Sequence, residues 1–405
     1  MEMPDGAETR LREYLDTIGE VLGHKKRRES FATYAMGLLG EGDRKSVEPL
    51  AARATGSPTG VNAAHQRLLH FVADSKWSDE AVREVAAKHA VAAMEQRSPV
   101  ASWILDDTGF LKQGKHSVGV QRQYTGSAGK ITNCQIGVSL CVATQQAQVP
   151  VDFELYLPES WTKDKARREE TRIPSEIEFK TKPELAMEMV KRAMAAGLPT
   201  GVMLADAAYG SSSTFRKGLR ELGLEYAVGV NSTTHVWRVD KLGVRYGRPL
   251  SAMELAKELG RKAFRRTAWR EGTRGQLFSN FAMRRVLVAH DDGTLPKNRE
   301  DVWLLMEWPD GEKEPTRFTL ATLPRNIARK KLVCIVKERY RTEKAYEELK
   351  GELGLDHFEG RSFPGWHHHV SVALSCYAFI VAERARSFFS ATQRQREARQ
   401  KRLTA

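Results

Sequence analysis

Apolar and polar positions follow helical spacing over roughly the first 95 residues. The segments 10–23, 61–75 and 79–94 place Leu, Ile, Val and Ala three or four residues apart, as amphipathic helices do. A stretch of Gly, Ser, Pro and Thr at 56–60 separates the first two of these segments and marks a turn. The pattern therefore predicts a helical region over residues 1–95.

A different pattern follows the helical region. Segments 102–107, 116–124 and 133–144 have the alternation and the β-branched content of strands. An amphipathic segment at 183–198 predicts a helix, and a strand, a helix and a second strand are predicted over 201–230. Strands that alternate with helices in this way indicate an α/β fold with a mixed sheet.

Beyond residue 230 the helical signal fades, and it returns near residue 324. Short segments with Trp and Arg resemble strands in this interval, whereas residues from 328 onward again have helical spacing. We therefore divide the chain into a helical domain (1–95), the first part of an α/β domain (96–230), a β-rich insertion (231–323), the C-terminal helices of the α/β domain (324–390) and a basic tail (391–405).

The balance of charge favours a polyanionic partner. The 405 residues include 64 Lys and Arg against 51 Asp and Glu, a net charge of +13, and the simplest partner for such an excess is nucleic acid. Basic residues concentrate in "HKKRRES" at 24–30 and between 384 and 402. For either basic cluster the alternative is a solvated face. For the N-terminal helices, a DNA-binding role is one explanation, and a helical cap on the next domain is the other.

Cysteine content and hydropathy indicate the cellular compartment of the protein. The four Cys residues form no CxxC pair, which argues against a zinc knuckle or a disulfide scaffold and for a reducing compartment. No segment of about 18 consecutive apolar residues is present, so we expect no membrane span. The first ten residues are polar and lack the apolar core of a secretory signal. We expect a cytoplasmic protein.

Two predicted strands lead directly into carboxylates. The first, "WILDDTGF", reaches Asp106 and Asp107, and the second, "LADAAYG", reaches Asp206. The carboxyl ends of neighbouring strands in an α/β sheet meet at one rim, where sites are built. Carboxylates placed there repel one another unless a cation lies between them, and Mg²⁺ or Mn²⁺ prefers such oxygen ligands. The pattern predicts a divalent-metal site.

A third ligand is expected from the helix that follows the insertion. Arg339, Glu343 and Lys350 lie at i, i+4 and i+11 and so share one helical face. That face would carry a metal-binding carboxylate flanked by two cations able to hold phosphates. A solvated face with i,i+4 salt bridges is the alternative. Composition alone does not choose among the acids of this helix, Glu343, Glu347, Glu348 and Glu352.

These segments resemble the DDE transposases of bacterial insertion sequences. The residues that carry the resemblance are "DDTGFLKQGKHSVGVQRQYTG", "LADAAYG" and "RYRTEKAYEELKGELGLDHFEGRSFPGWHHH", whose order and separations agree with that family. The chain looks most similar to the insertion-sequence 701 family, a relative of the group with a Tyr-Arg-Glu-Lys signature. The resemblance extends over about 99–369 and more weakly over the N-terminal helices.

The resemblance implies an RNase H-like catalytic domain with a metal-binding triad. Asp106, Asp206 and Glu343 match that triad, and Arg339 and Lys350 match the cations that contact transposon-end phosphates. The bound ions would be two Mg²⁺, or two Mn²⁺, arranged to activate the attacking oxygen and to stabilise the leaving one.

Two details of the resemblance require a choice. The signature's Tyr, three residues before the Arg, falls on Val336, so its role does not carry over to this chain. The family pattern of Asp, a variable residue and then Thr or Ser places the first ligand on Asp106. Because side chains alternate along a strand, Asp107 would then face the other side of the sheet, and it remains the alternative ligand.

The implied activity is DNA transposition, with cleavage at transposon ends followed by strand transfer into target DNA. Expected partners are double-stranded DNA, both the terminal inverted repeats and the target, and a second copy of the chain, since a homodimer on DNA would bring two ends together. Such a protein would be associated with the bacterial nucleoid. A related DNA endonuclease without strand transfer, and a non-catalytic DNA-binding protein derived from a transposase, are the alternatives.

Histidines and aromatic residues offer further candidates. The histidines at 367–369 suggest a metal, but neighbouring side chains of a helix point in different directions, so we expect a surface or DNA-facing role. Phe318, Trp303 and Trp308 lie in the insertion and could either pack in a core or stack on an extruded base.

Overall fold

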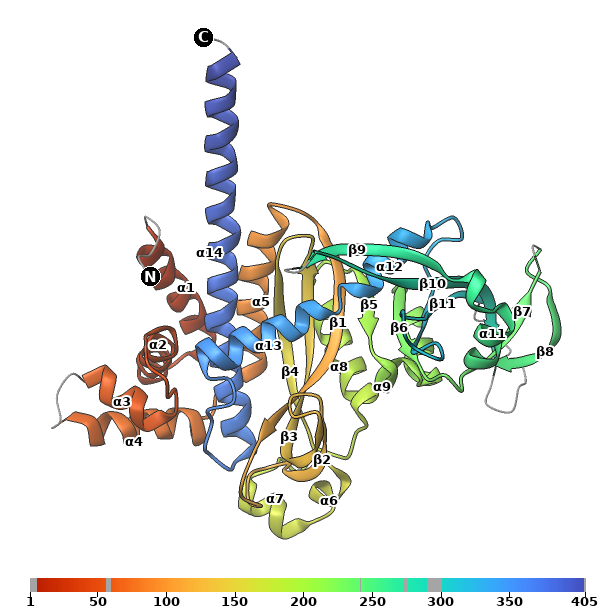
Figure 1. Cartoon of the computed structure of the whole chain (residues 1–405). Helices are drawn as coiled ribbons and strands as arrows, with labels where there is room; N and C mark the ends of the chain where they lie inside the picture. The colour runs from red at the N-terminus through yellow and green to blue at the C-terminus, as the bar shows by residue number, and fades with distance from the viewer. Residues whose placement is uncertain (1–5, 56–59, 241, 273–274, 290–300, 404–405) are drawn as a thin grey trace.

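The N-terminal part of the structure, a computed structural model, is a group of helices packed around the long C-terminal helix α14 (Phe363–Leu403) (Figure 1). The structure describes residues 6–55, 60–240, 242–272, 275–289 and 301–403, with side chains described as far as Ser387. Tyr14, Phe31 and Phe71 are buried in the core that these helices share. The helices are α1 (Ala7–Leu22), α2 (Lys25–Leu39), α3 (Val47–Thr55), α4 (Val61–Ala73) and α5 (Asp79–Glu95).

The central sheet has the strand order β4–β3–β1–β5–β6. Strands β4, β3 and β1 are antiparallel neighbours, whereas β5 and β6 run parallel to β1. The predicted α/β class with a mixed sheet is confirmed, and this order is consistent with an RNase H-like domain. The strands are β1 (Val100–Leu111), β3 (Lys130–Thr144), β4 (Gln148–Tyr156), β5 (Val202–Ala205) and β6 (Tyr226–Val230), and β2 (Gln121–Thr125) pairs with the first part of β3.

Helices between the strands begin at recognisable caps. Thr181 and Glu184 form a capping box at the start of α8 (Lys182–Ala195), which satisfies backbone N–H groups that have no partner within the helix. Ser212 caps α10 (Ser213–Glu221) in the same way by accepting the backbone N–H of Phe215. The shorter helices are α6 (Glu159–Thr162), α7 (Lys165–Thr171) and α9 (Ala207–Gly210).

The β-rich segment after residue 230 continues the central sheet. Strand β12 pairs antiparallel with β6, and β11, β10, β7 and β8 follow outward from it, so the boundary predicted at residue 230 falls inside one sheet. Among the described strands, β9 pairs with β10 alone and forms a hairpin that passes over α12 (Figure 1). The elements are β7 (His235–Val239), β8 (Arg245–Ser251), α11 (Ala252–Leu259), β9 (Arg265–Gly272), β10 (Gly275–Val288), β11 (Asp301–Glu307) and β12 (Arg317–Ala321).

The helical segment predicted from residue 328 is broken in two. Helix α12 (Arg329–Lys337) ends before a turn at Glu338 and Arg339, and α13 (Tyr340–Leu353) follows. Gly354 ends α13 in a left-handed conformation (φ 61°), which glycine adopts without steric cost. Within the described residues, no helix has the length and apolar content needed to cross a membrane.

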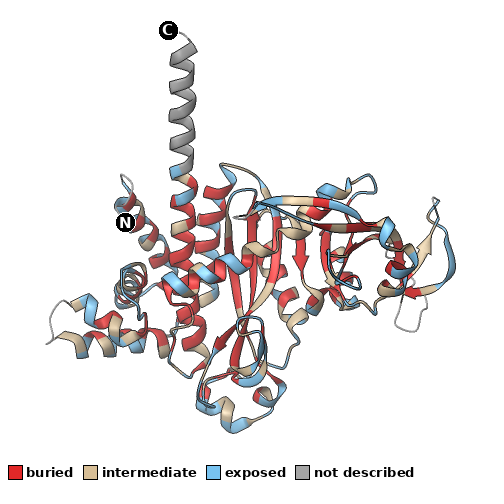
Figure 2. Cartoon of the chain, viewed as in Figure 1, coloured by how far each residue is buried: buried red, intermediate tan, exposed pale blue. Residues whose placement is uncertain are grey.

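The expectation for the histidines at 367–369 is wrong, because all three are buried in α14. Their exposed fractions are 4%, 4% and 0%. This part of α14 lies between the N-terminal helices and the sheet, so it is covered on every side (Figure 2). Each ring has a polar partner: His367 contacts Glu154, His368 contacts the carbonyls of Val72 and Trp77, and His369 contacts Tyr34 and the carbonyl of Gly354.

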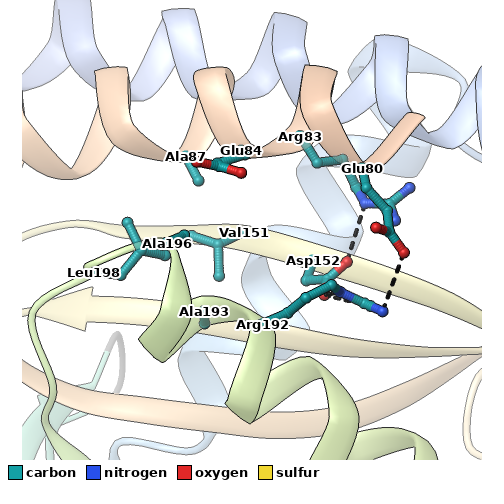
Figure 3. Close-up of a pocket in the computed structure, with 10 residues that line it drawn as sticks. All are labelled: Glu80, Arg83, Glu84, Ala87, Val151, Asp152, Arg192, Ala193, Ala196 and Leu198. Atoms are coloured by element: carbon teal, nitrogen blue, oxygen red, sulfur yellow. Dashed lines mark hydrogen bonds and ion pairs between the residues drawn. The ribbon is translucent and has the colours of Figure 1, made fainter. Parts of the chain in front are cut away.

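A buried network of ion pairs joins the N-terminal helices to the sheet beside a cavity of about 90 Å³ (Figure 3). Arg83 of α5 is 2% exposed and donates from Nε to Asp152 Oδ1 of β4 at 3.0 Å. Arg192 of α8 donates to the other Asp152 oxygen at 2.6 Å. His367 of α14 lies 3.2 Å from Glu154 of β4. Four elements therefore meet through paired charges, as buried charges require.

This network predicts a pH dependence of stability. Burial acts to raise the pKa of Glu154, but His367, Arg83 and Arg192 hold it well below its usual value. Burial acts to lower the pKa of His367, but Glu154 and Asp79 raise it above its usual value even though Arg83 opposes them. Arg192 and Asp152 are the other charged groups of the network.

The sign follows from linkage between protonation and folding. The contribution of Glu154 is present above its unfolded-state pKa near 4.5 and is lost as the pH falls through its folded-state value. The contribution of His367 is present below its unfolded-state pKa near 6.5 and is lost as the pH rises through its higher folded-state value. We expect urea unfolding to show a free energy of unfolding that decreases above about pH 6.5.

A matched pair of variants isolates the histidine. In His367→Gln the decrease on the alkaline side should become shallower, whereas His116→Gln, which removes an exposed histidine, should leave it unchanged. An equally steep decrease in His367→Gln and in the wild-type chain would contradict the assignment.

Candidate active site

Strands β1 and β5 place two aspartates side by side, with Asp106 inside β1 and Asp206 directly after the end of β5. The strands are parallel neighbours, with Ile104 paired to Leu204, and Asp106 and Asp206 each lie two residues further on. Since neighbouring strands are about 4.8 Å apart, the two carboxylates occupy adjacent positions. The convergence of Asp106 and Asp206 expected from the sequence is present.

The turn that carries Asp206 depends on close packing against β6. Strand β5 ends at Ala205, and Asp206 caps α9 by accepting the backbone N–H of Ala208 at 2.9 Å. The backbone at Asp206 lies directly against Gly229, where an added Cβ would come within 2.9 Å of the amide nitrogen of Ala207. A side chain at Gly229 would therefore push the Asp206 turn away from the sheet.

Asp106 and Asp107 face opposite sides of β1. Asp107 Oδ2 accepts from Lys182 at the start of α8 at 2.8 Å. Asp106 lies on the side of Ile104, which packs with residues of α12, and its Oδ2 is 3.3 Å from Arg339 Nη1. The two neighbours thus have different counter-charges, and only Asp106 shares its side of the sheet with the α12–α13 segment.

Carboxylates outnumber cations around Asp106. Burial raises the pKa of Asp106 to about 6, against the effect of Arg339, and the charges of Asp206 and Asp107 raise it further. Burial acts to lower the pKa of Arg339, but Asp106, Asp206 and Glu343 raise it above its usual value. One guanidinium therefore interacts with three carboxylates, which is fewer cations than acids.

Glu343 lies close to this group without completing a metal site. It is an exposed residue in the first turn of α13, one helical turn after Arg339. In the described part of the chain, no three acidic, histidine or cysteine side chains are near enough to one another to hold a metal ion. Arg339 Nη1 is buried and lacks a hydrogen-bond partner among the described residues, so its contact with Asp106 is an ion pair alone.

Lys350 connects α13 to β1. Its ammonium group donates to Thr108 Oγ1 at 2.8 Å and to the carbonyl of Gly109 at 2.7 Å. Burial lowers the pKa of Lys350, although Asp356 opposes this. The side chain therefore holds α13 against the strand that carries Asp106, and its contact with DNA stays a prediction.

Sequence reasoning missed two tyrosines beneath the site. Tyr346 is buried, and its hydroxyl lies 2.6 Å from that of Ser139 on β3. Tyr209 is fully buried, and its hydroxyl has no hydrogen-bond partner among the described residues. Tyr346 could have been found, because it is seven residues after Arg339 and so lies on the same helical face. Nothing in the spacing of Tyr209 indicated its position.

The three aromatic candidates of the insertion, Phe318, Trp303 and Trp308, are each buried or hydrogen-bonded within the protein. Phe318 is buried in the sheet. The indole N–H of Trp303 donates to the carbonyl of Pro324, and that of Trp308 donates to the carbonyl of Glu312. Of the two roles expected for them, packing within the protein and stacking on an extruded base, the structure has them in packing contacts.

Comparisons with known proteins match most of the chain. The family model described as "DDE superfamily endonuclease" matches residues 17–276, and the model described as "Transposase DDE domain" matches residues 183–379. A curated relative, the "Probable transposase for insertion sequence element IS701" of Microchaete diplosiphon, is 25% identical over 362 residues. That alignment covers 89% of this chain and 84% of the relative. The first family match includes Asp106 and Asp206, and the second includes Asp206 and Glu343.

Proposed function

The chain belongs to the DDE superfamily of endonucleases and is a transposase, and on this premise we propose that Asp106, Asp206 and Glu343 are its catalytic carboxylates. The observation that carries the proposal is the half-buried Asp106, which lies beside Asp206 at the end of the adjacent parallel strand and is paired with Arg339. Arg339 interacts with Glu343 as well, so the three acids share one counter-charge.

The residues of this site fit a divalent metal. Transposases of this family generally use divalent metal ions, and the donor set consists of carboxylate oxygens, which Mg²⁺ and Mn²⁺ prefer. A cationic side chain already lies against Asp106, which supports a need for positive charge at this position. We propose that Asp106, Asp206 and Glu343 hold two such ions, which would lower the pKa of an attacking water or 3′-hydroxyl and stabilise the leaving oxygen.

The protein supplies rigid support for these carboxylates. Asp106 is carried by a strand whose preceding residues, Trp103 to Leu105, are fully buried, so its position changes little when charge arrives. Lys350 anchors α13 to the same strand two residues further on. Glu343 is exposed and follows the turn between α12 and α13, so it is the member of the triad that can approach the other two.

Arg339 has a role in the free protein and another on DNA. Without DNA its guanidinium balances Asp106 and Asp206. A DNA phosphate offers an alternative partner for a guanidinium, with bidentate hydrogen bonds. When a DNA phosphate binds the Arg339 guanidinium, Asp106 and Asp206 lose their counter-charge and are free to bind metal.

Removal of Arg339 should strengthen metal binding in the absence of DNA. In Arg339→Ala the affinity for Mn²⁺, measured from the electron paramagnetic resonance of the free ion, should rise about tenfold or more, because a unit charge at this range is worth on the order of 1–4 kcal/mol. Arg341→Ala is the matched control, since Arg341 contacts Glu338 and the carbonyl of Gln145 and not Asp106. Equal Mn²⁺ affinities in Arg339→Ala and the wild-type chain would argue against this role.

DNA is the macromolecular partner of a transposase. We propose that the partner sequences are the terminal inverted repeats of an insertion sequence and a target duplex, that the N-terminal helices contact this DNA, and that two copies of the chain act together on it. Association with the nucleoid would follow from DNA binding. The support for these proposals is the net charge of +13 and the need to bring two ends together.

The proposed reaction is cleavage at the transposon ends followed by joining of the 3′ ends to target DNA. Assays with pre-cleaved ends test the joining step directly. Wild-type protein with Mg²⁺ should convert labelled ends into strand-transfer products, and protein that cuts intact ends but never joins pre-cleaved ones would be a nuclease. The two family matches and the relative favour neither that alternative nor a non-catalytic DNA-binding protein.

A further inference from the structure

The hydroxyl of Tyr209 in α9 is buried without a hydrogen-bond partner. The residue is 0% exposed, and its hydroxyl oxygen has no partner among the described residues. Other buried tyrosines differ, because their hydroxyls contact a carbonyl, a ring nitrogen, another hydroxyl and a carboxylate, in Tyr14, Tyr34, Tyr346 and Tyr377 respectively. Since a buried polar group without a partner is costly, the unsatisfied hydroxyl of Tyr209 calls for an explanation.

Close packing fixes the ring of Tyr209 beside the turn that carries Asp206. The backbone N–H groups of Tyr209 and Gly210 both donate to the carbonyl of Asp206, at 3.2 and 2.8 Å. Gly210 lies against β6, where an added Cβ would come within 2.1 Å of the carbonyl oxygen of Gly229. The ring of Tyr209 also packs beside that of Phe215 in α10, with the ring centroids 6.2 Å apart. The hydroxyl therefore has a fixed position relative to Asp206.

The carboxylates of the candidate active site act on this hydroxyl. Burial raises the pKa of Tyr209 well above its usual value, and the negative charges of Asp107, Tyr346, Asp106 and Asp206 raise it further. Because such interactions weaken with distance, the hydroxyl lies within range of both aspartates of the proposed triad. The raised pKa keeps the phenol protonated at neutral pH. Tyr209 is therefore a hydrogen-bond donor near carboxylate oxygens, which are acceptors.

Asp106 is the carboxylate that needs such a donor. Its Oδ1 accepts the backbone N–H of Asp107 at 2.9 Å. In the described part of the chain, the contact of its Oδ2 is the ion pair with Arg339, whose Nη1 has no hydrogen-bond partner there. Asp107 already has a lysine partner, and Asp206 acts on the pKa of the tyrosine less than Asp106 does. Asp106 Oδ2 would therefore lose its partner when Arg339 moves to a DNA phosphate.

We propose that Tyr209 is a positioning residue of the candidate active site, and that its hydroxyl donates to Asp106 once Arg339 has left and Asp106 holds metal. The inference rests on the proposed function and deepens it. Carboxylates that bind metal are themselves hydrogen-bonded by neighbouring groups that orient them. In the free protein the hydroxyl lacks an acceptor and Asp106 Oδ2 lacks a hydrogen-bond donor. In the metal-bound protein each would satisfy the other.

The variant Tyr209→Phe of the full chain removes the hydroxyl and keeps the ring, so it separates positioning from packing. In urea unfolding without metal, its midpoint should equal or exceed that of the wild-type chain, because a hydroxyl without a partner contributes no hydrogen bond. In complex with a pre-cleaved transposon end, its affinity for Mn²⁺ should be about 10–100-fold lower than that of the wild-type complex. The electron paramagnetic resonance of free Mn²⁺ measures this affinity, with the duplex alone as the blank.

Tyr14→Phe is the matched control, because it removes a buried hydroxyl that has a partner. The Tyr14 hydroxyl donates to the carbonyl of Ser375 at 2.8 Å and joins α1 to α14, neither of which carries a residue of the proposed triad. Loss of this hydrogen bond should lower the urea midpoint and leave the Mn²⁺ affinity unchanged. Half-maximal cleavage should require more Mg²⁺ in Tyr209→Phe and not in Tyr14→Phe, and saturating Mg²⁺ should restore most of the rate.

The outcomes separate the role of Tyr209 from the function on which it rests. Equal Mn²⁺ affinities in Tyr209→Phe and the wild-type complex, or a urea midpoint lowered as in Tyr14→Phe, would overturn the inference and leave the proposed triad standing. A wild-type complex that binds no more Mn²⁺ than the duplex alone would overturn both. In a crystal structure of the wild-type complex with Mn²⁺, the hydroxyl should lie about 2.5–3.0 Å from an Asp106 oxygen, and a hydroxyl bonded to another residue would overturn the assignment of its acceptor.

Discussion

Replacing Asp206 with asparagine is expected to reduce DNA cleavage and strand transfer by at least about 10²–10³-fold, the loss that follows removal of a group that stabilises developing charge. Asparagine keeps the size of the side chain and can still accept the backbone N–H of Ala208, as Asp206 does, because Asn is as good a helix cap as Asp. Folding and DNA affinity should therefore be unchanged. Gel assays with labelled ends measure the activity, and anisotropy measures the affinity.

A neighbouring pair of aspartates supplies the control. Asp106→Asn should lose activity to the same extent as Asp206→Asn. Asp107→Asn should lose less than about tenfold, within the range for a residue that does not act on the reacting atoms, because Asp107 faces Lys182 on the other side of β1. If Asp107→Asn abolished activity and Asp106→Asn did not, Asp107 would be the first ligand.

Replacing Arg83 with methionine is expected to lower the free energy of unfolding by about 3–5 kcal/mol, the usual cost of removing one partner from a buried ion pair. Arg83 is 2% exposed and contacts Asp79, Asp152 and Glu154. Methionine fills a similar volume but leaves these carboxylates with Arg192 and His367 as their remaining cations. Chemical denaturation of the full chain measures the loss.

The control for Arg83 lies five residues later on the same helix. Lys88 is half exposed and pairs with Glu84, so Lys88→Met should change the free energy of unfolding by less than about 1 kcal/mol, as exposed pairs do. A loss in Arg83→Met no larger than that in Lys88→Met would mean that the network does not join the N-terminal helices to the sheet.

Local sequence patterns predicted those features of the site that follow from the direction of a strand or the periodicity of a helix. The strands that carry Asp106 and Asp206 to neighbouring positions were visible as apolar segments leading into acids. The first strand was expected to end at Asp106 and Asp107, but β1 continues to Leu111, and only β5 ends at its acid. Helical periodicity alone predicted a shared face for Arg339, Glu343 and Lys350; Arg339 and Lys350 both contact β1, whereas Glu343 is exposed. These features need no knowledge of what packs against them.

Features that depend on tertiary contacts could not be predicted from sequence patterns. The histidines at 367–369 were assigned to a surface, because their polarity gives no sign that α14 is covered on all sides and that each ring has a buried partner. The turn at Glu338 contains no Pro or Gly to announce it. The ion pair between Arg339 and Asp106 joins residues 233 positions apart in sequence, a separation at which periodicity carries no information.

The central claim is that three distant carboxylates meet around metal when DNA releases Arg339. The most direct test is a crystal structure of the chain with a pre-cleaved transposon end and Mn²⁺, with the ions located by anomalous scattering. The account predicts two peaks, each about 2.0–2.2 Å from oxygens of Asp106, Asp206 or Glu343, and a guanidinium of Arg339 on a DNA phosphate. Ions bound by other residues, with Arg339 still against Asp106 and Glu343 out of reach, would contradict it.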